Sequence, residues 1–108
     1  MTHPSVIRPA DHAVFSAAKM GKTTLFESPR VLVGLNAFEP GQQHALHAHG
    51  GQDKFYHVLE GKGLFTVGSD IREAGPGQVV WAASGVDHGV RNAGPESLVL
   101  LVGIAPAP

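Results

Sequence analysis

Three histidines in this chain have the type and spacing needed to bind a metal ion. His47 and His49 form a His-x-His pair, and His88 follows later inside a stretch bounded by glycines. Residues two apart in an extended strand point to the same face of a sheet, so the pair aims two imidazoles at one point. Neutral imidazole is the commonest side-chain ligand for a divalent metal. A third imidazole from a neighbouring strand would complete a three-nitrogen site.

The elements that position these histidines are short strands separated by turns. Fourteen glycines and eight prolines recur along the 108 residues, and no stretch of ten residues has helical periodicity. We expect strands at 23–27, 30–38, 43–49, 55–59, 64–67, 71–73, 78–81, 88–91 and 98–104, with a weaker one at 13–16. The pattern predicts an all-β domain, either a closed barrel or a small sandwich. Its predicted bounds are 23–104, with an N-terminal arm at 1–22 and a short C-terminal tail at 105–108.

Composition limits the classes of partner. Hydrophobic residues make up 43% of the chain and charged residues 16%, which excludes disorder. The formal net charge is −1 and lysine and arginine do not cluster, so we expect no nucleic-acid partner. The absence of cysteine excludes disulfides and thiolate metal sites. We see neither a signal peptide nor an apolar run of bilayer length, and therefore expect a cytoplasmic protein with no membrane partner.

Two glycine–histidine motifs resemble those of the cupin family. In the first, Gly41 is followed after five residues by His47, then by His49, and Gly61 ends the next predicted strand. In the second, Gly77 is followed by Ala83, Gly85, His88 and Asn92, where the family has a proline in place of Ala83. The two motifs stand in the family's order, fifteen residues apart, and together they cover about a third of the chain.

The resemblance implies a single-domain jelly-roll β-barrel of antiparallel strands with a metal in its mouth. The counterparts of the family's histidine ligands are His47, His49 and His88. The ion would be a divalent transition metal, and Fe, Mn, Ni, Zn and Cu are not distinguished by this ligand set.

One departure from the family pattern bears directly on the metal. Six residues separate the family's usual glutamate ligand from the closing glycine, and here that position is Lys54. An ammonium group about 5 Å from a divalent ion costs roughly 6–7 kcal/mol at an effective dielectric constant near 20. Either Lys54 turns away, or the metal is absent, or Lys54 is neutral, or an anion lies between them.

Gln52 and Asp53 precede Lys54 and offer replacement oxygens. Alternation from Lys54 places Gln52 on the inner face and Asp53 on the outer face. We therefore predict Gln52 as the fourth metal ligand, with three histidines plus water as the alternative.

Lys54 and Tyr56 share one face of their strand and are the candidate catalytic residues. The structural alternatives are a surface pair of Lys54 with Asp53 or Glu60, and simple packing of Tyr56. The parity of His44 is opposite to that of His47, so we expect His44 to face outward. We expect Phe65 and Trp81 to be core or pocket-wall residues.

These residues suggest two classes of function. The first is a metal-dependent enzyme of the dioxygenase, isomerase or lyase type, acting on a small oxygenated metabolite, because these chemistries occur in the family that the chain resembles. The second is a non-enzymatic module that binds or senses a small molecule. A homodimer is expected, because residues 98–104 and the face with Phe55, His57 and Leu59 carry more apolar surface than so small a barrel can cover.

Overall fold

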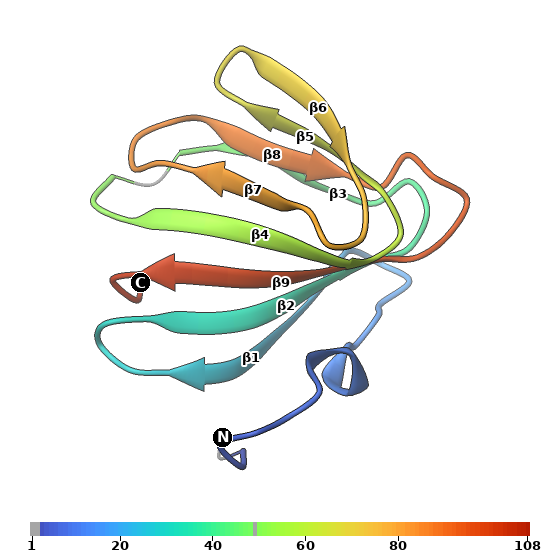
Figure 1. Ribbon diagram of the computed structural model, residues 1–108. Helices are drawn as coiled ribbons and strands as arrows, with labels where there is room; N and C mark the ends of the chain where they lie inside the picture. Colours follow the sequence, from blue (N-terminus) through green and yellow to red (C-terminus); the bar gives the residue numbers. More distant parts are fainter. Residues whose placement is uncertain (1–2, 49) are drawn as a thin grey trace.

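The computed structural model describes residues 3–48 and 50–108 and shows two antiparallel sheets that face each other (Figure 1). The strands are β1 (Gly21–Glu27), β2 (Leu32–Phe38), β3 (Gln43–His47), β4 (Asp53–Glu60), β5 (Gly63–Val67), β6 (Asp70–Ala74), β7 (Val79–Ala82), β8 (His88–Arg91) and β9 (Leu98–Ala105). One sheet has the order β1-β2-β9-β4-β7 and the other β3-β8-β5-β6. A 3₁₀ turn, η1 (Pro9–His12), lies in the N-terminal arm.

The predicted jelly roll is confirmed, and the sheets are open at their edges. Every predicted strand between 23 and 104 is present, with ends that moved by no more than two residues where the structure describes them. Within the described residues no backbone ladder joins the two sheets, so they do not close into a continuous barrel. The weak strand predicted at 13–16 does not form, and that segment is irregular. No helix in the described part of the chain is long and apolar enough to span a membrane.

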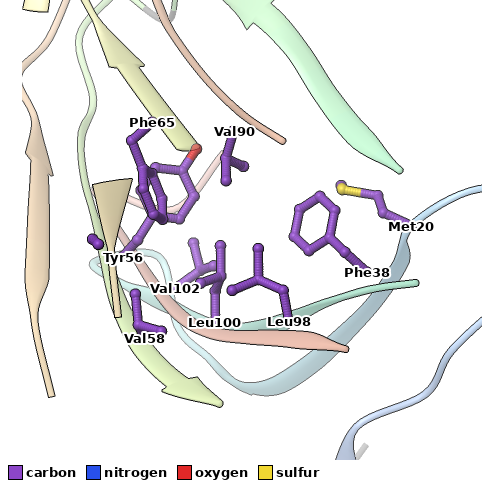
Figure 2. Close-up of a cluster of buried hydrophobic side chains, with 10 residues drawn as sticks. Met20, Phe38, Tyr56, Val58, Phe65, Val90, Leu98, Leu100 and Val102 are labelled. Atoms are coloured by element: carbon purple, nitrogen blue, oxygen red, sulfur yellow. The ribbon is translucent and has the colours of Figure 1, made fainter. Parts of the chain in front are cut away.

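The main core lies between the two sheets, where side chains of alternate residues meet. In β4 the inward residues are Lys54, Tyr56 and Val58, which are 5%, 0% and 0% exposed. Figure 2 shows the surrounding cluster, in which Tyr56 and Phe65 lie near Val90 and the β9 side chains lie beneath them. Burial of each large apolar side chain contributes about 1.5–3 kcal/mol, so this cluster holds the sheets face to face.

A second apolar cluster covers the outer face of the larger sheet. Leu25, Leu35 and Val99 are buried there, and Ile7 and Ala13 of the N-terminal arm pack against them. This packing explains why β2 and β9 are apolar on both faces. It also attaches the arm, predicted at 1–22, to the domain. The arm leaves Trp81 on the same outer face 56% exposed, whereas Phe65 is in the core as expected.

The motif residues Gly61 and Asn92 have structural roles at turns. Gly61 has φ of +76°, and a Cβ there would overlap the carbonyl oxygen of Ser97, so only glycine fits. The Asn92 side chain donates to the carbonyl oxygens of Phe38, at 3.1 Å, and Glu96, at 2.8 Å, and accepts from the Gly94 N–H. Asn92 therefore fixes the turn after β8 to the end of β2.

Candidate functional site

Two of the predicted metal ligands meet at one end of the smaller sheet. His47 is the last residue of β3, His88 is the first residue of β8, and the two are direct partners in the ladder. Their ring centroids are 4.3 Å apart. His88 is 2% exposed and His47 is half-buried, so the pair faces the space between the sheets. The structure thus brings together two imidazoles that are 41 residues apart in the sequence.

Backbone hydrogen bonds determine which nitrogen of each ring can bind a metal. His47 Nδ1 lies 2.7 Å from the carbonyl oxygen of Ala45, and His88 Nδ1 lies 2.9 Å from that of Val86. A carbonyl oxygen only accepts, so both Nδ1 atoms carry a proton, and in the neutral form of each ring the lone pair is on Nε2. Both Nε2 atoms are buried. Metal-binding histidines are commonly oriented in this way by a carbonyl group, so this donor set fits a divalent metal.

The prediction that His44 faces outward is wrong. His44 pairs with Val90 and His47 pairs with His88, so three steps on β3 correspond to two steps on β8. The extra residue is a β-bulge, which reverses the alternation and turns both His44 and His47 inward. Their ring centroids are 4.2 Å apart. His44 Nδ1 is buried and has no hydrogen-bond partner among the described residues.

The surroundings keep His44 uncharged. Burial lowers the pKa of His44 from 6.5 to about 3, and the charges of Lys54, His47, Lys22 and His88 act in the same direction. A neutral ring at physiological pH retains a lone pair. His44 is therefore an additional nitrogen donor that simple alternation did not reveal.

The third predicted ligand, His49, lies outside the described residues. Among residues 3–48 and 50–108, no three histidine, aspartate or glutamate side chains are arranged to hold one metal ion. The structure therefore describes two of the three predicted imidazole ligands, and His49 remains a predicted one.

Lys54 lies inside the fold and makes no surface pair. It is 5% exposed, and its Nζ lies 4.8 Å from the centroid of the Tyr56 ring. Neither a carboxylate nor another hydrogen-bonding group contacts its Nζ within the described chain. The alternative of a surface pair with Asp53 or Glu60 is therefore wrong. Burial, followed by the charge of Lys22, lowers the pKa of Lys54 from 10.5 to about 8.

Each of the two candidate oxygen ligands has a hydrogen-bond partner in the protein. The Asp53 carboxylate accepts a hydrogen bond of 2.9 Å from the Ser84 N–H, which directs it away from the interior. The Gln52 amide nitrogen donates to the carbonyl oxygen of Pro106 at 3.2 Å. If Gln52 binds a metal, its amide oxygen is the atom available for the contact, and coordination by Gln52 stays a prediction.

Tyr56 places a phenol in the interior. The side chain is fully buried, and its ring centroid lies 5.4 Å from that of Phe65 and 6.3 Å from that of His88. In Figure 2 its hydroxyl group points toward Phe65 and Val90, on the sheet that also carries His88. Within the described structure the buried hydroxyl has no hydrogen-bond partner. Burial raises the pKa of Tyr56, so the hydroxyl stays protonated and can donate to a ligand.

Two polar residues near Lys54, one exposed and one buried, were missed by sequence reasoning. Lys22 and Asn36 are direct partners between β1 and β2 on the face that carries Lys54, and Asn36 is only 5% exposed. Both line a cleft of about 200 Å³ that also contains Lys54. The one available signal was an asparagine within the apolar strand 32–38, and no local pattern related it to Lys22.

The chain is similar to several known proteins. The family described as Cupin domain matches residues 34–104. The crystal structure of TT1209 from Thermus thermophilus is 37% identical, with a TM-score of 0.93 over 97% of this chain and 100% of that one. An RmlC-like cupin protein from Desulfovibrio desulfuricans is 27% identical, with a TM-score of 0.80 over 98% and 97% of the two chains.

An uncharacterized protein of Streptomyces coelicolor is 33% identical over 70 residues. That match covers 65% of this chain and 66% of the relative, which is just under two thirds of its length. With the two histidine motifs, the two facing sheets and a family match over most of its length, the chain belongs to the cupin domain family.

Proposed function

We propose that this cupin holds a divalent transition metal through His47, His49 and His88 and is a metal-dependent enzyme for a small oxygenated metabolite. The observation that supports it best is the matched pair of Nδ1 contacts to the carbonyl oxygens of Ala45 and Val86. These contacts orient the two lone pairs before any ion binds, which lowers the cost of forming the site. Fe, Mn, Ni, Zn and Cu all suit such ligands.

The bound ion would polarise an oxygen atom of the substrate, which serves reactions of the dioxygenase, isomerase or lyase type. The protein supplies the surroundings. In this proposal the Tyr56 hydroxyl donates a hydrogen bond to the substrate and the Lys54 ammonium attracts negative charge on it. Phe65 and Val102 are 2% and 3% exposed and exclude water from the space between the sheets. Gln52 is the proposed fourth ligand.

Metal analysis of the purified protein tests the site. After removal of bound metal and reloading with each first-row ion in turn, we expect one ion per chain in the native protein. His47→Ala, His49→Ala and His88→Ala should each weaken binding at least tenfold. His57→Ala is the matched control, because His57 lies on the outer face of the same sheet that carries Lys54. An unchanged metal content in His47→Ala and His88→Ala would refute the proposal.

His44→Ala separates the two candidate third ligands. If His49 completes the site, the His44 variant should retain metal affinity within about threefold of the native protein. If instead His44→Ala loses metal and His49→Ala retains it, His44 and not His49 is the third ligand.

The second candidate is a non-enzymatic binding or sensing module. It is favoured by the lysine at the family's usual carboxylate-ligand position, because a buried cation weakens a metal site. Turnover and oxygen uptake, measured with the loaded protein across diols, keto acids and sugars, discriminate the two. Saturable binding without turnover would support the module.

We also propose that the protein forms a homodimer. On the outer face of the larger sheet, Trp81 and Val79 are 56% and 61% exposed. They are register partners of Phe55 and His57, so the four side chains form one continuous surface. The other surface suggested by the sequence, residues 98–104, is mostly buried within the protomer, because β9 is a central strand covered on both faces.

A further inference from the structure

A cleft on the inner face of the larger sheet combines cationic, polar and apolar groups. Its volume is about 200 Å³, the space of roughly six or seven waters at ~30 Å³ each. Lys54 and Asn36 are buried in it, and Lys22 and Thr24 lie at its exposed rim on β1. Leu32, Val102 and Ile104 supply apolar walls.

The charged side chains of this cleft are both positive. They are Lys22 and Lys54; among the described residues no aspartate or glutamate side chain lines the cleft, and Pro108, at the end of the described chain, also lies at its wall. Lys54 is only 5% exposed, and its nearest compensation is the face of the Tyr56 ring. A cation–π contact recovers only part of the free energy that desolvation of an ammonium group costs. A bound anion would offset that cost.

Register places the two cations on opposite sides of a gap. Lys54 pairs with Ile104, and Lys22 pairs with Asn36. Between these positions β2 presents Gly34, the partner of Val102 and of Thr24, where a Cβ would overlap the carbonyl oxygen of Thr23. Backbone therefore forms the wall of the cleft between the two cations.

We propose that this cleft binds a small aliphatic monocarboxylic acid, with its carboxylate held between Lys54 and Lys22 and its apolar body against Val102 and Ile104. The Asn36 amide and the Thr24 hydroxyl offer further hydrogen bonds. A phosphate group fits less well, because the cleft lacks an arginine and no helix begins at it. Apolar walls match the body of an organic acid, and an inorganic anion would leave them wet.

The cleft adjoins a second cleft that contains one of the imidazoles. Lys22 also lines a neighbouring cleft that contains His44, and the charges of Lys54 and Lys22 both act on His44. The inference rests on the proposed function only in treating the acid as the substrate, since its binding needs no metal.

The test uses metal-free protein and two probes of equal shape, isobutyrate and its uncharged amide, isobutyramide. We expect isobutyrate to give saturable shifts of backbone amide NMR signals at residues 22–24, 34–36 and 54–56. Isobutyramide should bind at least tenfold more weakly. Lys54→Met should lose at least tenfold in affinity for isobutyrate, and Lys22→Met at least threefold. Lys62→Met is the control, because the Lys62 side chain is 68% exposed and lies near Glu73 instead of the cleft.

Three outcomes would overturn the inference. They are equal affinity for the acid and the amide, unchanged isobutyrate binding in Lys54→Met, and displacement of isobutyrate by inorganic phosphate at equal or lower concentration. The comparison of acid with amide uses the native protein, so it decides the matter even if a variant fails to fold. Because the protein is free of metal in this test, these outcomes do not bear on the proposed metal site. Failure of the protein to bind metal would likewise leave the isobutyrate result unchanged.

Discussion

Lys54→Met is expected to stabilise the metal-free protein at pH 7, because the folded chain buries an ammonium group that lacks a carboxylate partner. Burial and the charge of Lys22 lower the pKa of Lys54 from 10.5 to about 8. At about 1.36 kcal/mol for each pH unit, that difference is worth about 3 kcal/mol of lost stability. Methionine has a similar length and removes the charge.

The pH dependence follows from the sign of this change. Between pH 8 and 10.5 the folded chain has released the Lys54 proton while the unfolded chain still holds it, so stability increases with pH across this window. Below pH 8 both states are protonated and the full penalty remains. The other groups facing Lys54 do not titrate as it does: His44 has a pKa of about 3, and burial raises the pKa of Tyr56. Lys22 supplies the nearby positive charge that acts on Lys54.

Urea unfolding of both proteins at several pH values between 7 and 10.5 measures the difference. We expect the variant to be more stable by about 3 kcal/mol at pH 7, and the difference to shrink steadily above pH 8. Lys62→Met, on the exposed surface, should change stability by less than about 0.5 kcal/mol. A Lys54 variant less stable than the native protein at pH 7, or a gap independent of pH, would refute the reasoning.

Three further predictions concern stability and assembly. Gly61→Ala should lower the free energy of unfolding in urea by more than about 1 kcal/mol, because φ is +76° and a Cβ would meet Ser97. Gly50→Ala is the control and should be near neutral, because a Cβ at Gly50 would lie in open space. Asn92→Ala removes three hydrogen bonds and should lower the free energy of unfolding by about 2–3 kcal/mol. A loss below ~0.5 kcal/mol, which is typical of surface substitutions, would contradict the role of Asn92 in the turn. Trp81→Glu should convert the proposed dimer to a monomer, as measured by light scattering, without changing the free energy of unfolding of the monomer. A native protein that is already monomeric would exclude the interface.

The strands and their facing directions followed largely from local pattern. Alternation within 53–60 correctly placed Lys54, Tyr56 and Val58 inside and Asp53 outside. Side chains of a strand alternate between two faces, so once one face must be buried the direction of every residue is set. His44 was misplaced because a bulge adds one residue to β3, and the sequence of β3 alone does not show where its partner β8 pairs. Lys22 and Asn36 were missed for the same kind of reason, since they meet only across a ladder.

The amino-acid sequence by itself determined the family, the order of the strands along the chain and the meeting of His47 with His88. Turn glycines and alternating apolar residues act over a few neighbours, and such local constraints can be recognised without coordinates. Tertiary structure alone decided that His44 joins the imidazoles, that Lys54 is buried without a carboxylate, and that Lys22 shares its cleft. These facts depend on which strands pair and in which register, because charge and burial are set by neighbours distant in the chain.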